Sequence, residues 1–168
     1  GKIVDFYTNH CAEEISKART MASVGNYDEA ISRMMAVPNV CADCYDKCQV
    51  AATSFYQQKI DAYGLQQLNK ARNAWMTSQD AYGANEVAQY LNVISPYSSC
   101  YQDVEMLRKE VASKLNADEL REWNFQSKQY EDSQAYKKSI VKACRDVGMA
   151  WANNQPKSIA KTIIRGWW

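Results

Sequence analysis

One stretch of sequence occurs twice in this chain, about 55 residues apart, and this repetition restricts the possible folds more than any other feature. Each copy contains Lys-Ala-Arg, then a glycine followed five residues later by an alanine, then a proline and the pair Cys-Tyr. The first copy comprises Lys17–Arg19, Gly25–Ala30, Pro38 and Cys44–Tyr45, and the second comprises Lys70–Arg72, Gly83–Ala88, Pro96 and Cys100–Tyr101. Repetition at such a period is typical of stacked helical units that bury their apolar faces against one another. Arrays of this kind usually present a binding surface, so we expect recognition of a partner and not catalysis.

Apolar residues recur with a helical period along most of the chain, and no segment predicts a strand. The clearest apolar stripe contains Cys41, Cys44, Tyr45, Cys48, Ala52, Phe55 and Tyr56. It continues to about Tyr63, and Gly64 is expected to end that helix because glycine disfavours helix interiors.

Terminal signals predict further helix boundaries. Gly25 is expected to end the first helix, since glycine commonly follows the last helical residue. Asn26 with Glu29, and Asn116 with Glu119, resemble capping boxes that open a helix. The second pair is expected to open a long final helix.

These patterns predict one all-α domain over residues 1–168, built as an array of helical hairpins. Two related units are expected at about 12–63 and 65–115, followed by a long final helix at about 117–153. An amphipathic tail is expected at 157–168, with Lys157, Lys161 and Arg165 opposite an apolar face that ends in Trp167 and Trp168.

The segment Gly25–Ile31 resembles the turn and second-helix opening of a tetratricopeptide repeat, and a fainter copy follows between Gln67 and Ile94. The family's Trp, Leu-Gly and Tyr positions in the preceding helix fall here on Glu14, Lys17–Ala18 and Met21. The resemblance implies an α-solenoid that binds a protein partner. The cysteine-rich and tyrosine-rich double unit also resembles helical segments of exported Bacteroidetes proteins, which slightly favours the cell envelope or export over the cytoplasm.

Composition excludes several functional classes. The 168 residues carry a formal net charge of +1, so no overall field favours nucleic acid or an anionic membrane. No apolar run approaches the roughly 20 residues that span a bilayer. Hydrolase chemistry finds no support, because the one histidine, His10, has no nucleophile motif associated with it. We expect no enzyme and no cofactor.

The cysteines allow three interpretations, which are disulfides, six buried free thiols, and a redox or metal site. Six are present, at positions Cys11, Cys41, Cys44, Cys48, Cys100 and Cys144, and an even number is compatible with disulfides between neighbouring helices. Cys41 and Cys44 are expected either to bridge each other or to supply a partner for Cys11. The alternative is a redox or metal-binding protein that uses Cys41, Cys44 and Cys48, whose spacing allows thiolate ligands.

Aromatic side chains supply the candidate contacts with a partner protein. They occur where the apolar pattern is weakest, at Tyr82, Tyr90, Tyr97, Trp123, Phe125 and Tyr130. Trp167 and Trp168 in the tail are further candidates. The tail is interpreted first as a cap on the array, then as a partner contact, and only last as a peripheral membrane anchor.

Overall fold

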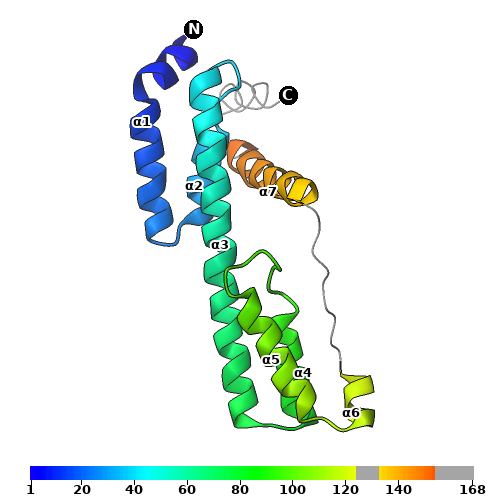
Figure 1. Ribbon diagram of the computed structural model, residues 1–168. Coiled ribbons are helices and arrows are strands. Elements are labelled where there is room, and N and C mark those ends of the chain that lie inside the picture. Colours follow the sequence, from blue (N-terminus) through cyan, green and yellow to red (C-terminus); the bar gives the residue numbers. More distant parts are fainter. Residues whose placement is uncertain (124–132, 154–168) are drawn as a thin grey trace. The chain divides into compact units, whose positions relative to one another are not determined.

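The computed structural model describes residues 1–123 and 133–153, and these residues form seven α-helices and no strand. The all-α prediction is therefore confirmed. The helices are α1 Lys2–Ser23, α2 Tyr27–Met35, α3 Ala42–Thr77, α4 Ala81–Leu91, α5 Tyr101–Ser113, α6 Ala117–Glu122 and α7 Ser133–Asn153 (Figure 1). The chain divides into two compact units, which are Gly1–Lys59 with Glu131–Trp168 (unit 1) and Ile60–Tyr130 (unit 2). The predicted boundary near Gly64 thus falls inside α3, close to the boundary between the units.

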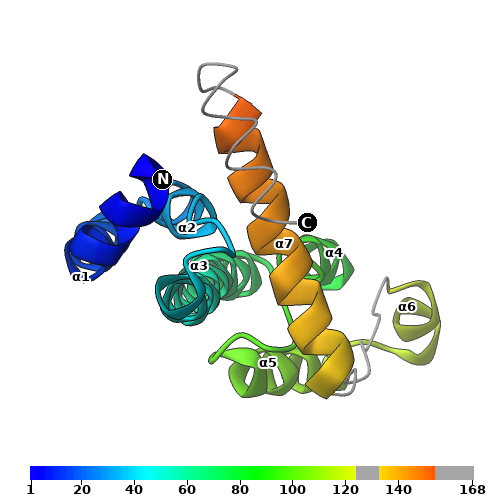
Figure 2. The same ribbon diagram turned by 90° about the horizontal axis from the view of Figure 1, so that it is seen from above.

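Unit 1 contains α1, α2, the first part of α3 and α7. The first three lie side by side, and α7 lies at an angle to them, on the side away from α1 (Figures 1 and 2). α2 packs against both α1 and α7. Its apolar residues recur at helical spacing and lose nearly all solvent contact, which is the dominant favourable term in folding. The largest fully buried side chains of this unit are Ile31, Met34, Met35 and Val37.

Unit 2 contains the second part of α3 together with α4, α5 and α6. Its core is formed by Leu68, Trp75, Val87, Leu91, Val104 and Val111, among others. One charged group is also buried there, because Arg108 on α5 is only 3% exposed. Its guanidinium lies 3.1 Å from the Tyr101 hydroxyl and 3.0 Å from a Glu105 carboxylate oxygen. These partners compensate the desolvation of the buried charge.

The turn between α1 and α2 forms where the sequence places it. Gly25 has a φ of +88°, a left-handed conformation that glycine adopts without steric cost. Its N–H donates to Ala22 O at 3.0 Å, and the N–H of Asn26 donates to Met21 O at 2.9 Å. These two bonds make a Schellman motif, which satisfies carbonyls at the end of α1.

Only one of the two expected capping boxes forms. Asn116 accepts from the N–H of Glu119 at 2.9 Å, and a Glu119 carboxylate oxygen accepts from the N–H of Asn116 at 3.0 Å. Asn26 begins α2 without any capping bond from its side chain. Its predicted capping box is therefore wrong, because the Asn26 N–H already belongs to the Schellman motif of α1.

Gly64 does not end a helix, which corrects the prediction made from the sequence. α3 runs through it for 36 residues. A Cβ atom at this position would lie 2.9 Å from Ser98 Oγ and 3.2 Å from Cys100 Sγ. Glycine is needed here because the loop before α5 approaches the α3 backbone closely.

The long final helix predicted at 117–153 is also corrected, because two separate helices occupy the described part of this range. α6 ends at Glu122, and Trp123 has an extended backbone with ψ of 123°. The Trp123 ring is buried in unit 2, where its Nε1 donates to Ala84 O at 2.7 Å. Burial of this large side chain outweighs continuation of the helix. α7 then begins at Ser133.

Candidate functional site

Three cysteines form a sulfur cluster in unit 1, with Cys11 on α1 and Cys44 and Cys48 on α3. Cys11 and Cys44 form a disulfide, and their Cα atoms are 5.8 Å apart. The Sγ atoms of Cys44 and Cys48 are 3.8 Å apart. All three sulfurs lie within 4.8 Å of one another. The cluster connects α1 to α3.

The members of this cluster differ from those predicted. The sequence groups Cys41 with Cys44 and Cys48, whereas the structure places Cys11 beside Cys44 and Cys48. Within 1–123 and 133–153, this is the one group of three or more potential metal ligands with suitable spacing. Since Cys11 and Cys44 are bonded to each other, only the Cys48 thiol remains available in the cluster. The arrangement therefore favours a structural bridge over a metal centre.

Three of the remaining thiols, those of Cys41, Cys48 and Cys144, are buried in surroundings that favour the protonated form. Burial, together with the nearby Glu14 carboxylate, raises the pKa of Cys48 to about 12. Burial also raises the pKa of Cys144 to about 11 and raises that of Cys41. The thiolate is the reactive form of cysteine. These thiols are therefore weak nucleophiles at neutral pH and act as small packing groups.

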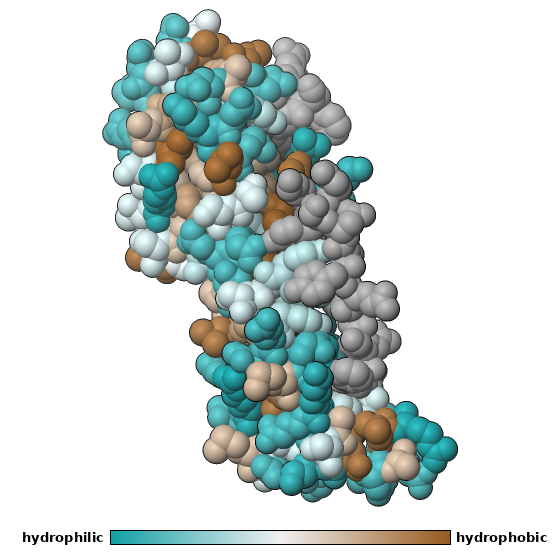
Figure 3. All heavy atoms as spheres, viewed as in Figure 1, coloured by the Kyte–Doolittle hydropathy of each residue, from teal (hydrophilic) through white to brown (hydrophobic). Residues whose placement is uncertain are grey.

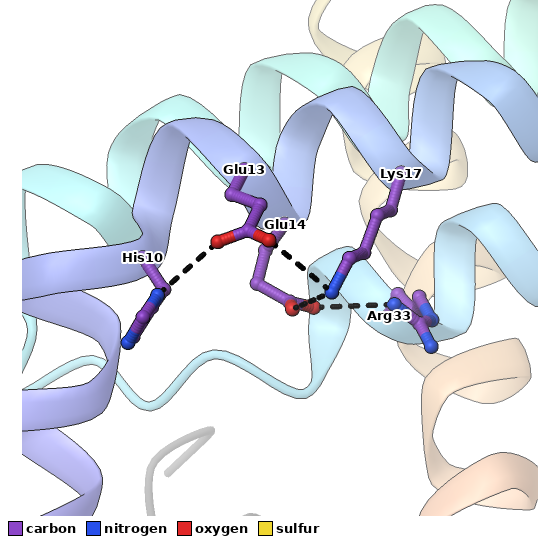
Figure 4. Close-up of polar contacts among 5 residues, drawn as sticks. All are labelled: His10, Glu13, Glu14, Lys17 and Arg33. Carbon is purple, nitrogen blue, oxygen red and sulfur yellow. Dashed lines mark hydrogen bonds and ion pairs between the residues drawn. The ribbon is translucent and has the colours of Figure 1, made fainter.

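The one histidine belongs to a network of charged side chains on α1 and α2 (Figure 4). His10 Nδ1 lies 3.2 Å from Glu13 Oε2, and Lys17 Nζ lies 3.7 Å from Glu13 and 3.6 Å from Glu14. Arg33 Nη1 is 3.4 Å from Glu14. The hydrogen bond with His10, followed by the charge of Lys17, lowers the pKa of Glu13. Figure 4 shows ion pairs along a helix surface, with no serine, threonine or cysteine among the five residues drawn.

An open groove of about 580 Å³ lies between α1 and α3 in unit 1. Its floor is formed by the buried side chains Ile15, Ala51 and Phe55. Val50 is 73% exposed beside them. The rim is polar and includes Arg19, Asp46, Lys47, Ser54 and Gln58. We call this the α1–α3 groove.

A second open groove, of about 500 Å³, lies between α3 and α5 in unit 2. Trp75 and Leu107 line it as buried residues, whereas Met76 is 77% and Met106 67% exposed. The polar residues along it are Arg72, Gln79, Asp103 and Glu110. We call this the α3–α5 groove. Methionine is flexible and polarisable, which suits it to an adaptable binding surface.

The aromatic residues predicted to contact a partner have different environments. Tyr82 is 68% exposed. Tyr90 and Tyr97 are half-buried, and Trp123 is buried, so its ring is not available at the surface. Trp123 therefore serves the core of unit 2. The other four predicted contacts, Phe125, Tyr130, Trp167 and Trp168, lie outside the described residues, as does the amphipathic tail.

Sequence reasoning did not identify the groove residues Val50, Met76 and Met106. The sequence signal that could identify them is a large apolar side chain at a position outside the buried face of its helix. Figure 3 shows hydrophobic side chains as small patches among hydrophilic ones on one face of the protein. Single exposed apolar residues are common on protein surfaces. Only the adjoining groove makes these three informative.

No protein-family model, curated protein or solved structure matches this chain. None of the described helices is long and apolar enough to cross a membrane.

Proposed function

We propose that this chain is a non-catalytic protein-binding or scaffolding module, built as a tetratricopeptide-like array of helices. One observation carries the proposal: an open groove with an exposed large apolar residue occurs in each unit. Val50 and Met106 are these residues, and the spacing between them equals that between Cys44 and Cys100. Grooves with apolar floors and polar rims are typical sites for helical segments of partner proteins.

Burial at corresponding positions supports a common plan for the two units. One set of corresponding positions follows from the spacing between Lys17–Arg19 and Lys70–Arg72. By this spacing, Leu68 corresponds to Ile15, Ala71 to Ala18 and Trp75 to Ala22. A second set follows from the spacing between Cys44 and Cys100. By this spacing, Val104 corresponds to Cys48, Leu107 to Ala51, Arg108 to Ala52 and Val111 to Phe55. All of these side chains are buried. In this proposal α3 closes the first helical group and opens the second.

The sulfur chemistry supports an oxidising compartment for the proposed module. A disulfide between Cys11 and Cys44 persists in an oxidising environment and is rare in a reducing cytosol. The proposal therefore places the module in the cell envelope or outside the cell.

The test is partner capture with matched surface variants. The immobilised chain is exposed to an extract of its own cells, captured proteins are identified by mass spectrometry, and each is purified for calorimetric titration. We expect Val50→Asp to abolish binding of at least one of them. Val40→Asp provides the control, because Val40 is 68% exposed but lies outside both grooves.

If Val50→Asp and Val40→Asp bind every purified partner as tightly as the native chain does, the α1–α3 groove is not the binding site. Met106→Asp then tests the α3–α5 groove in the same assay. Unchanged binding in all three variants would remove the observation on which the proposal depends.

The alternative, a redox or metal-binding protein, is favoured only by the proximity of Cys48 to the Cys11–Cys44 pair. Metal analysis of the purified chain, combined with thiol titration under denaturing conditions, separates the two functions. A stoichiometric metal ion, or one abnormally reactive thiol, would support the alternative. Inert thiols beside one disulfide support the binding module.

A further inference from the structure

We infer that the α1–α3 groove binds an amphipathic helix of a partner protein that carries acidic side chains, and that Arg19 receives one of their carboxylates. This inference rests on the proposed function and specifies the chemistry of the partner. It comes from comparing the charged residues of the two grooves at corresponding positions.

Arg19 and Arg72 correspond, since both end the repeated Lys-Ala-Arg sequence. In the α3–α5 groove, Arg72 Nη2 lies 3.8 Å from Asp103 Oδ2. The position that corresponds to Asp103 in the α1–α3 groove is Lys47, by the spacing that relates Cys44 to Cys100. Arg19 consequently faces a groove where the equivalent carboxylate is replaced by a cation.

Arg19 makes no ion pair with any residue of the described ranges, in contrast to Arg72. Lys47 is paired along its own helix, with Nζ 3.1 Å from Asp43 Oδ2. Asp46 is the one acidic residue that lines the α1–α3 groove. A carboxylate from a partner would therefore supply to Arg19 what Asp103 supplies to Arg72 within the chain.

The shape of the α1–α3 groove favours a helix as the occupant. Its α3 side runs from Asp46 to Gln58. At a rise of about 1.5 Å per residue, this corresponds to about 18 Å, or a little over three turns of a helix. A partner helix with apolar residues at i, i+3 or i+4, and i+7 would contact Val50 and the apolar floor, while acidic residues beside them reach the rim.

Two designed peptides test the inference. Both are helix-stabilised and carry leucines at i, i+3 and i+7; one has glutamates beside the leucines and the other has lysines at those positions. Binding to the full chain is measured by fluorescence anisotropy at low salt. We expect the glutamate peptide to bind about two- to fivefold more tightly, which is within the range that one exposed ion pair supplies. Arg19→Glu should reverse this preference.

Arg72→Glu is the matched control, because it makes the same change at the corresponding position of unit 2. It should leave the preference for the glutamate peptide unchanged, and circular dichroism should show both variants folded. A preference that Arg72→Glu reverses, and Arg19→Glu does not, would assign the acidic partner to the other groove and overturn the inference.

The remaining outcomes separate this inference from the proposed function. If both peptides bind equally, and Val50→Asp but not Val40→Asp weakens both, the acidic partner is wrong while the binding groove stands. If neither peptide binds, the inference fails, and the partner-capture experiment still decides whether the chain binds proteins.

Discussion

At the scale of single residues, the contact between Cys11 and Cys44 is the one covalent restraint between two described helices. The two residues are separated by 33 positions in the sequence. A bridge across such a loop restricts the unfolded chain and typically stabilises the folded state by about 2–4 kcal/mol. We expect Cys11→Ser to lower the free energy of unfolding by about this amount, measured by urea denaturation under oxidising conditions.

Reduction provides the control for this prediction. Dithiothreitol should destabilise the native chain and leave Cys11→Ser unaffected, whereas Cys100→Ser should keep its sensitivity to the reductant. Titration of the denatured, unreduced protein should find thiols only at Cys41, Cys48, Cys100 and Cys144. Six titratable thiols would show that the bridge does not form in solution.

Buried thiols also predict how stability changes with pH. Cys48 and Cys144 have pKa values of about 12 and about 11, raised by burial from 9.0. Above pH 9.0 the unfolded chain releases these protons while the folded chain retains them. The contribution of these two thiols to the free energy of unfolding is therefore fully present below that pH, and it is lost as the pH rises toward the two raised pKa values. The urea midpoint of unfolding should therefore decrease as the pH rises. The decrease should be less steep in Cys48→Ala and Cys144→Ala, each of which lacks one buried thiol, than in the control variant Ser32→Ala, which keeps both.

At the scale of elements, α3 departs most from what its sequence predicts. Helical periodicity correctly indicates helices on both sides of Gly64, but the glycine is read as a break. The absence of a side chain at Gly64 allows Ser98, Cys100 and Ile94 to pack against the α3 backbone. A Cβ atom at this position would lie 2.9–3.2 Å from their side-chain atoms. Helix propensity describes the isolated helix, whereas these contacts come from residues 30 to 36 positions further along the chain.

Replacing Gly64 tests the effect of helix propensity against the effect of this close contact. Alanine favours a helix by about 1 kcal/mol over glycine, whereas overpacking a buried contact costs about 1–3 kcal/mol. We therefore expect Gly64→Ala to destabilise the protein by up to about 2 kcal/mol in urea denaturation. Asn69→Ala, at an exposed position of α3, should be neutral or stabilising. Adding Ser98→Ala should recover part of the loss; stabilisation by Gly64→Ala alone would contradict the packing argument.

At the scale of the whole molecule, the proposed correspondence between the two units can be tested chemically. The spacing that relates Lys17 to Lys70 places Cys11 opposite Gly64, and Cys44 corresponds to Cys100. A Cβ atom on Gly64 would lie 3.2 Å from Cys100 Sγ. We expect Gly64→Cys to form a second bridge with Cys100, so that the denatured, unreduced protein has free thiols only at Cys41, Cys48 and Cys144. Peptide mapping by mass spectrometry identifies the linked pair, and a thiol remaining free on Cys100 would count against the correspondence.

The helical class, the turn at Gly25 and the start of α6 could be predicted from the amino-acid sequence alone, because each depends on residues within a few positions of one another. Four other features depend on tertiary packing: the continuity of α3, the end of α6 at Glu122, the pairing of Cys11 with Cys44 and the position of both grooves. Each of these requires atoms distant in sequence to meet, and a periodic pattern states which face of a helix is apolar without stating what packs against it. For the same reason, exposed Val50 and Met106 gain meaning only beside the helices that border them.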